Sequence, residues 1–91
     1  MLRITTHLDT TRIIFELEGR LAGLWVRELE RCWHQLAVTD QPVRVVLRAV
    51  TFIDGDGRKL LAEMHRSGAE LTAEGCMTRA IIEEISRGER T

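Results

Sequence analysis

The stretch Thr51-Phe52-Ile53-Asp54-Gly55-Asp56-Gly57 decides the fold, because it joins two segments of opposite character. The apolar run from Val43 to Val50 before it predicts a buried strand, and the amphipathic run from about Arg58 to Arg66 after it predicts a helix. Two carboxylates and two glycines therefore fall at a strand-to-helix turn. Unpaired backbone N–H groups at a helix start stabilise negative charge, so this turn is the first candidate for a functional site.

Two β-type segments precede the central strand. Residues Leu2 to Leu8 alternate between apolar and polar, and Arg12 to Glu18 is rich in β-branched and aromatic side chains. The polar turn Asp9–Thr11 between them predicts an antiparallel hairpin. The residues Gly19 to Gly23 are expected to form a loop.

A first helix is predicted over Trp25 to Ala37, and Thr39 to Pro42 should end it and turn the chain. Apolar residues recur in it at helical spacing and should form the buried stripe: Trp25, Val26, Leu29, Cys32, Trp33 and Leu36. The tryptophans are interpreted as core residues rather than a stacking platform, with Trp25 the more exposed of the two.

The segment after the central turn predicts a helix, an edge strand and a last helix. Leu60, Leu61 and Met64 mark the buried stripe of the first of these helices, and Ser67-Gly68 should terminate it. The edge strand should span Ala69 to Glu74. The remaining expectations are a turn at Gly75–Met77, an N-cap at Thr78, inward-facing Ile81, Ile82 and Ile85, and a frayed tail from Gly88 to Thr91.

The predicted order is β-β-α-β-α-β-α, in one domain spanning residues 1–91. Strands that alternate with helices favour parallel pairing through right-handed crossovers. The fold class is therefore α/β, with a mostly parallel four-stranded mixed sheet packed by helices. Whether the helices cover one face or divide unequally between two stays open. Binding sites of such sheets lie beyond the carboxyl ends of the strands, where the Asp54 turn falls.

Composition excludes several classes of function. With 13 basic and 14 acidic residues the net charge is -1, so the chain has no strong field for nucleic acid or an anionic membrane. No apolar run is long enough to insert into a membrane, and no signal peptide is recognised. Cys32 and Cys76 lack CxxC spacing and are expected to be reduced thiols of a cytoplasmic protein.

Closely spaced aspartates suggest metal-dependent chemistry. A calcium loop starting at Asp54 would place Arg58, Lys59 and His65 at its fifth, sixth and twelfth positions, so it fails. His7 and His34 are isolated like His65, no zinc spacing occurs, and neither a metal nor a cofactor is expected.

The segment Asp54-Gly55-Asp56-Gly57 resembles the strand-Asp-x-Asp-Gly motif of haloacid-dehalogenase-like phosphatases. A metal-dependent phosphatase with Asp54 as nucleophile and Asp56 as general acid is therefore an alternative. The motif follows the third strand of a short chain, whereas that family places it on the first strand of a longer one. A catalytic function is accordingly not expected.

The strand order and three motifs together resemble the STAS domain family of sulfate transporters and anti-sigma factor antagonists. The strongest is Val50–Gly57, similar to the family's V-x-F-I-D-S-S-G. The segment Phe15–Leu21 is similar to its L-x-G-x-L/I-D, and Gly68–Leu71 with Gly75 is similar to its G-x-x-L…G.

This resemblance implies a non-catalytic protein-interaction module that binds a kinase-like anti-sigma factor through the loop and the following helix. In the family the partner phosphorylates the second serine of the loop and so switches binding off. The implied partner-binding residues are Asp54, Gly55, Asp56, Gly57, Arg58, Lys59, Glu63 and Arg66. A subunit of an ABC-type transport complex that binds the ATPase is a second possibility, and an oligomeric scaffold built on Ala69–Glu74 is a third.

The chain departs from the family pattern at the switch. Asp56 occupies the phosphoacceptor position, Gly55 replaces the first serine, and Arg58 replaces a leucine. Val46 stands where an acidic residue is common. Asp56 either mimics the phosphorylated state or serves only as a helix N-cap, and the N-cap is favoured because Gly55 is also changed. Phosphorylation at the usual position is not expected; Thr51 and Ser67 remain alternative acceptors.

Overall fold

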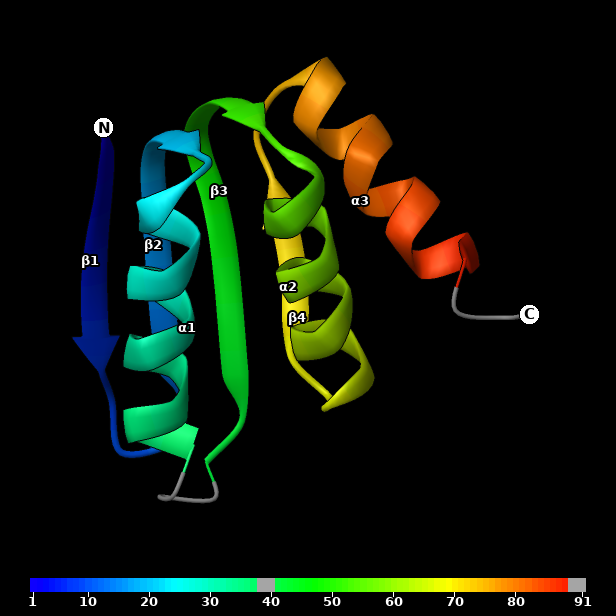
Figure 1. The fold of residues 1–91 in the computed structure, drawn as a ribbon. Helices are drawn as coiled ribbons and strands as arrows, with labels where there is room; N and C mark the ends of the chain where they lie inside the picture. The colour runs from blue at the N-terminus through cyan, green and yellow to red at the C-terminus, as the bar shows by residue number, and fades with distance from the viewer. Residues whose placement is uncertain (38–40, 89–91) are drawn as a thin grey trace.

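The computed structural model describes residues 1–37 and 41–88 (Figure 1). Its elements are β1 (Leu2–Leu8), β2 (Ile13–Leu21), α1 (Leu24–Ala37), β3 (Val43–Ile53), α2 (Gly55–Arg66), β4 (Glu70–Ala73) and α3 (Cys76–Gly88). The predicted order of strands and helices is confirmed. The predicted turn at Thr39 and Asp40 and the end of the predicted tail lie outside the described residues.

The four strands form one sheet in the order β1-β2-β3-β4. β1 pairs antiparallel with β2, whereas β2 with β3 and β3 with β4 are parallel. The mostly parallel mixed sheet is therefore confirmed, and so is the edge position of β4. β2 and β3 are both interior, and their carboxyl ends lie side by side where Leu21 pairs with Ile53.

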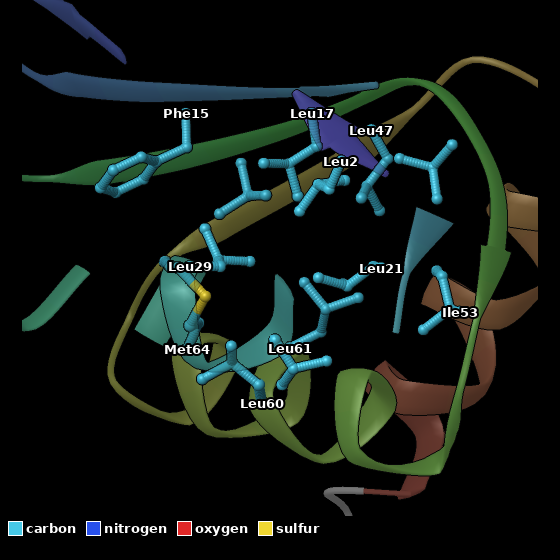
Figure 2. Close-up of a cluster of buried hydrophobic side chains, with 14 of the residues drawn as sticks. Leu2, Phe15, Leu17, Leu21, Leu29, Leu47, Ile53, Leu60, Leu61 and Met64 are labelled. Atoms are coloured by element: carbon cyan, nitrogen blue, oxygen red, sulfur yellow. The ribbon is translucent and has the colours of Figure 1, made fainter. Parts of the chain in front are cut away.

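One face of the sheet carries the core. Alternate residues of β2 and β3 are buried there, including Phe15 and Leu47, and they meet Leu29 of α1 and Met64 of α2 (Figure 2). Each large apolar side chain so buried contributes about 1.5–3 kcal/mol. α1 and α2 lie side by side over this face, and α3 lies beyond them, against α2 and β4 (Figure 1).

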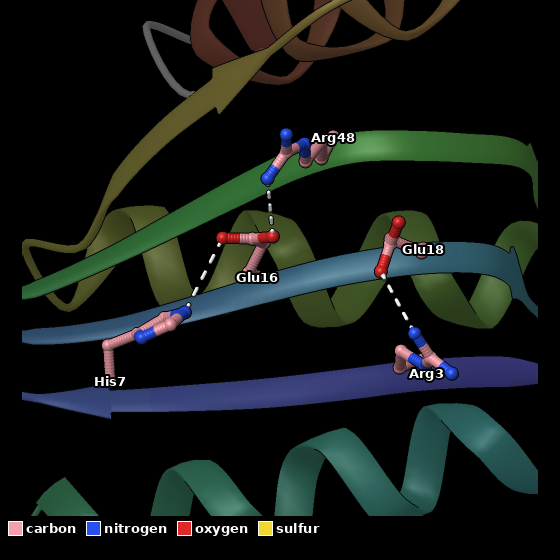
Figure 3. Close-up of polar contacts among 5 residues, drawn as sticks. All are labelled: Arg3, His7, Glu16, Glu18 and Arg48. Atoms are coloured by element: carbon pink, nitrogen blue, oxygen red, sulfur yellow. Dashed lines mark hydrogen bonds and ion pairs between the residues drawn. The ribbon is translucent and has the colours of Figure 1, made fainter.

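The opposite face is polar and carries ion pairs between strands (Figure 3). Glu16 lies 3.0 Å from the guanidinium of Arg48 and 3.5 Å from the imidazole of His7, and Arg3 lies 4.0 Å from Glu18. The alternation of apolar and charged residues along β2 thus explains why the described helices cover one face only.

The predicted loop at Gly19–Gly23 is wrong, because β2 continues through Gly19 to Leu21. Gly19 adopts φ +110, and a Cβ there would lie 2.2 Å from the Met1 carbonyl oxygen. The β2–β3 register shifts on either side of it. A glycine can mark a strand irregularity rather than a strand end, and it does so here.

The predicted helix starts at Arg58 and Thr78 are also wrong, because α2 begins at Gly55 and α3 at Cys76. Thr78 is therefore not an N-cap. It is buried inside α3, and its hydroxyl donates to the Val50 carbonyl oxygen at 3.2 Å. The Arg79 N–H donates to the Gly75 carbonyl oxygen at 3.0 Å, just before the start of α3.

The two tryptophans of α1 lie in different environments. Trp33 packs against the core, as predicted, whereas Trp25 is 36% exposed and lies outside the core cluster. Cys32 is a partly buried free thiol. Among the described residues, no helix has the length and hydropathy needed to cross a membrane.

Candidate functional site

Asp54 connects the turn before α1 to the turn before α2, at the carboxyl ends of β2 and β3. One carboxylate oxygen, Oδ1, accepts the backbone N–H of Gly57 at 2.7 Å and so caps α2. The other, Oδ2, accepts the backbone N–H of Gly23 at 3.0 Å, immediately before α1. The Asp54 N–H donates to the Leu21 carbonyl oxygen at 3.1 Å. The end of β2 and the start of α2 are thus fastened by one residue.

These hydrogen bonds change the acidity of Asp54. Donation from the Gly23 backbone, and next from the Gly57 backbone, holds the pKa of this carboxyl below its usual value. Asp54 is therefore ionised at neutral pH, and its charge lies at the N-terminus of α2, where the helix dipole favours it.

Asp56 is not the N-cap, so that interpretation of the residue is wrong. It is the second residue of α2 and is exposed, whereas Asp54 supplies the cap. The reason lies in the backbone: Asp54 is extended, as a capping residue is, and its side chain accepts the Gly57 N–H, whereas Asp56 already lies within the helix. Asp56 adds a solvent-facing negative charge to the first turn.

The two glycines of the turn serve different purposes. A Cβ on Gly57 would lie 2.8 Å from the Leu21 carbonyl oxygen and 3.0 Å from the Ile53 side chain. The buried Gly57 therefore lets α2 begin directly against the end of β2. A Cβ on Gly55 would meet no atom within 4 Å in the described structure, so that position tolerates a side chain.

A groove of about 230 Å³ runs between α1 and α2, from their first turns to Glu30 and Glu63. Three of the expected binding residues line it from α2, namely Asp56, Lys59 and Glu63. Residues that sequence reasoning did not select line it from the α1 side and its floor: Gly23, Val26, Arg27, Glu30 and Leu60. Arg27 and Glu30 were recognisable in the sequence as charged positions of the helix, but only the packing of α1 beside α2 places them opposite Lys59.

The remaining expected residues do not lie in this groove. Arg58 points to α3, where its guanidinium forms an ion pair with Glu84. Arg66 lies in the last turn of α2, away from the capped end. The eight expected residues thus divide into a structural pair (Asp54, Gly57), a groove set (Asp56, Lys59, Glu63) and three residues outside both (Gly55, Arg58, Arg66).

Exposed apolar side chains surround the same edge of the sheet. Leu24 and Trp25 in the first turn of α1 are 74% and 36% exposed, and Phe52 near the end of β3 is 46% exposed. The Arg20 guanidinium carbon lies 4.8 Å from the centroid of the Phe52 ring. Sequence reasoning anticipated only Trp25, because the exposure of Leu24 and Phe52 depends on where the turns leave the sheet.

A second hollow, of about 550 Å³, lies on the other side of the Asp54 turn. It is lined by the end of β3, by the β4–α3 turn and by α3, including Phe52, Glu74 and Ile81. Its lining is mostly apolar and includes the exposed ring of Phe52. The Asp54 turn is therefore flanked by a charged groove on one side and an apolar hollow on the other.

The arrangement does not favour the chemistry of a phosphoaspartyl enzyme. Each oxygen of Asp54 accepts a backbone N–H, and this hydrogen bonding stabilises the ionised carboxylate and weakens it as a nucleophile. No group of three or more metal-ligating side chains occurs among the described residues. The geometry of Asp54 is that of a structural cap, whereas the groove presents charged side chains to solvent.

Comparison with solved structures places the fold. An anti-sigma factor antagonist from Mycobacterium paratuberculosis superimposes with a TM-score of 0.82 at 18% identity, over 99% of this chain and 82% of that chain. A structure described as Mglu superimposes with a TM-score of 0.63 at 21% identity, over 79% of this chain but only 19% of that chain.

Comparison of sequences, unlike comparison of structures, finds no match. No protein-family model matches the chain, and no curated protein matches its sequence. The likeness therefore lies in the three-dimensional structure, where it extends over almost every residue. The order of strands, the mixed sheet and the position of the Asp54 turn agree with the expectation from the three sequence motifs. The chain has the STAS-like fold of an anti-sigma factor antagonist.

Proposed function

We propose that the chain is a protein-interaction module of the anti-sigma factor antagonist type. Its binding surface would be the start of α2 together with the groove between α1 and α2, and its partner a kinase-like anti-sigma factor or another regulatory protein. One observation carries the proposal: Asp54 is engaged in holding the turns, while Asp56, Lys59 and Glu63 face the groove. The STAS-like fold supports this type of module.

The composition of this surface is suited to a protein partner. Charged residues line the groove, and Leu24 and Trp25 are exposed in the adjoining turn of α1. Protein interfaces commonly combine an aromatic or aliphatic anchor with a polar rim, and tryptophan is enriched among the residues that dominate binding. We assign Trp25 the role of anchor and Lys59 the role of rim contact.

We also propose that phosphorylation at the usual position does not control binding. A serine hydroxyl accepts a stable phosphate ester, whereas Asp56 offers only a carboxylate. Incubation with ATP and a kinase-type partner should leave Asp56 without an acid-stable phosphate. A stable adduct at Thr51 or Ser67, both exposed, would show that a switch exists at another place.

The matched gain-of-function variant is Asp56→Ser. It restores a hydroxyl at the second position of α2, which is exposed to a partner. If the partner is a kinase-like anti-sigma factor, ATP should weaken its binding to this variant and leave its binding to the wild-type chain unchanged. An equal effect of ATP on both proteins would contradict the proposal.

The direct test is to recover partners with the purified native chain, identify them, and titrate each candidate by calorimetry. Trp25→Ala should weaken binding by about tenfold or more, and Lys59→Ala should weaken it less. Arg87→Ala on exposed α3 is the matched control and should leave affinity unchanged. Full affinity in both groove-side variants would contradict the assigned surface. The identity of the partner separates an anti-sigma factor from a transporter ATPase.

A further inference from the structure

β1 forms the open edge of the sheet. It runs from Leu2 to Leu8 in regular antiparallel register with β2, and it contains no proline. Within residues 1–37 and 41–88 no strand pairs with its outer side. The other edge strand, β4, has only four residues and contacts α3 (Figure 1). An open edge of unpaired N–H and C=O groups is a template for pairing with another strand.

Two hydrogen bonds fix which backbone groups face outward. The Met1 carbonyl oxygen accepts from the Arg20 N–H at 3.0 Å, and the Asp9 N–H donates to the Arg12 carbonyl oxygen at 3.0 Å. Both groups therefore point toward β2. Backbone direction alternates along a strand, so Arg3, Thr5 and His7 also point toward β2. The outward groups belong to the even-numbered residues Leu2, Ile4, Thr6 and Leu8.

We propose that two copies of this chain associate through antiparallel pairing of their β1 strands about a two-fold axis at Thr5. Thr5 then lies opposite Thr5 of the second copy, Ile4 opposite Thr6, and Leu2 opposite Leu8. This is the symmetric register that pairs the whole of β1. Every outward N–H and C=O of the even-numbered residues gains a partner, and the sheet continues from one copy into the other.

The side chains are self-complementary in this register. On the helix-covered face, the buried Leu2 of one copy lies opposite Leu8 of the other, which is 68% exposed in the isolated chain. Ile4, which packs against the core, lies opposite Thr6. The cores of the two copies thus become continuous, and the exposed Leu8 loses contact with water.

The polar face fits the same register. Arg3 lies opposite His7 of the second copy, and each residue already has a carboxylate beside it (Figure 3). Glu18 lies 4.0 Å from Arg3, and Glu16 lies 3.5 Å from His7. Arg3 of one copy and His7 of the other therefore lie opposite each other, and each has an acidic side chain, Glu18 or Glu16, beside it.

Cysteine cross-linking tests the register. In a Cys32→Ser, Cys76→Ser background, Thr5→Cys places two thiols opposite each other in a non-hydrogen-bonded pair, whose Cα atoms are about 4.5 Å apart. That distance lies in the range that a disulfide spans, about 4.4–6.8 Å. Arg3→Cys is the matched control, because it faces His7 of the second copy and not itself. Thr5→Cys should form the disulfide-linked dimer about tenfold faster or more.

A backbone variant tests the association itself. Thr6→Pro removes an N–H that points outward, so the ladder with β2 stays intact and the thermal unfolding midpoint should change little. Sedimentation equilibrium over a roughly hundredfold concentration range should show the mass of the wild-type chain rising and that of Thr6→Pro remaining monomeric. Three results overturn the proposal: a wild-type chain that stays monomeric, a mass increase that survives Thr6→Pro, or equal cross-linking of the two cysteine variants.

Discussion

A single carboxylate at Asp54 connects the two turns that form the candidate site. Its oxygens accept the backbone N–H groups of Gly57 and Gly23, which stand 34 sequence positions apart at the starts of α2 and α1. Because one residue satisfies both turns, its loss disturbs the helix cap and the α1 entry together. Asp56, two residues later, makes no such connection and is exposed.

Asp54→Ala is expected to destabilise the fold more than Asp56→Asn does. The first substitution leaves the Gly57 and Gly23 N–H groups without their acceptor, whereas the second removes only an exposed charge. Urea unfolding followed by circular dichroism measures both. An Asp54→Ala midpoint at or above that of Asp56→Asn would disprove the role of Asp54 as a clamp.

The lowered pKa of Asp54 predicts a loss of stability in acid. The backbone N–H groups that lower this pKa bind the ionised form. The stabilisation is therefore fully present above the pKa of an unfolded aspartate, about 3.9, and is lost as the pH falls through the lower folded-state value. Asp54→Asn lacks this titration, so the difference in unfolding free energy between wild type and variant should shrink below about pH 4. A difference that does not change with pH would argue against it.

Gly57 and Gly55 offer a matched pair of substitutions two residues apart. Gly57→Ala forces a methyl group to within 2.8 Å of the Leu21 carbonyl oxygen, so it should cost about 1–3 kcal/mol. Gly55→Ala meets open space and restricts the unfolded chain, so it should stabilise by up to about 1 kcal/mol. Chemical denaturation gives both values, and opposite signs are the expected result. Equal effects would mean that α2 does not pack this closely on β2.

At the scale of elements, one buried and one exposed polar contact connect α3 to the rest of the described structure. The Thr78 hydroxyl donates to the Val50 carbonyl oxygen in a buried position, and Arg58 of α2 pairs with Glu84 on the surface. Exposed ion pairs contribute little, whereas a buried acceptor left without its donor costs more. The Thr78 bond is thus the more important of the two for docking α3 beside the end of β3.

Thr78→Val should destabilise the fold by about 1–2 kcal/mol, because it keeps the shape but leaves the Val50 carbonyl oxygen without the hydroxyl. Thr78→Ser keeps the hydroxyl and is the control. Hydrogen exchange should show the loss concentrated in α3. A Thr78→Val chain as stable as Thr78→Ser would show that the bond makes no net contribution.

The elements also show where sequence reasoning succeeds and where it stops. The buried stripe of α2 followed from the helical spacing of its apolar residues, and β2 and β3 followed from their β-branched, aromatic and apolar content. The starts of α2 and α3 did not follow, since Gly55 and Gly57 have poor helix propensity and Thr78 has the chemistry of a cap. The Asp54 cap sets the start of α2, and the close approach of Leu21 explains the glycine at position 57, whereas the Thr78 hydroxyl binds the Val50 carbonyl oxygen instead of capping α3.

At the scale of the molecule, most of the exposed large apolar side chains lie at the same end of the sheet as the Asp54 turn, beyond the carboxyl ends of β2 and β3. The location of this edge followed from the sequence, because strand order places the turn at the carboxyl ends of β2 and β3. The groove did not follow, because Arg27 and Glu30 come opposite Lys59 only when α1 packs beside α2. A local sequence pattern indicates which side of a helix or strand is buried, whereas the residues that face each other across two packed helices depend on the whole fold.

The molecule as a whole is expected to hydrolyse no phosphate ester in the presence of magnesium. Each oxygen of Asp54 accepts a backbone N–H, which stabilises the ionised carboxylate and so weakens it as a nucleophile. An assay with a general phosphatase substrate should give the same background rate for the wild-type chain and for Asp54→Asn. Turnover that requires Asp54 would reinstate the enzyme interpretation.

The central claim is that a protein partner binds at the start of α2 and along the α1–α2 groove. Hydrogen–deuterium exchange of the native chain, with and without its recovered partner, tests it most directly. The proposed surface predicts new protection at residues 23–30 and 55–63, with little change at the opposite end of the sheet around Trp33, Pro42 and Ser67. Protection confined to that opposite end, with the groove residues unchanged, would contradict the claim.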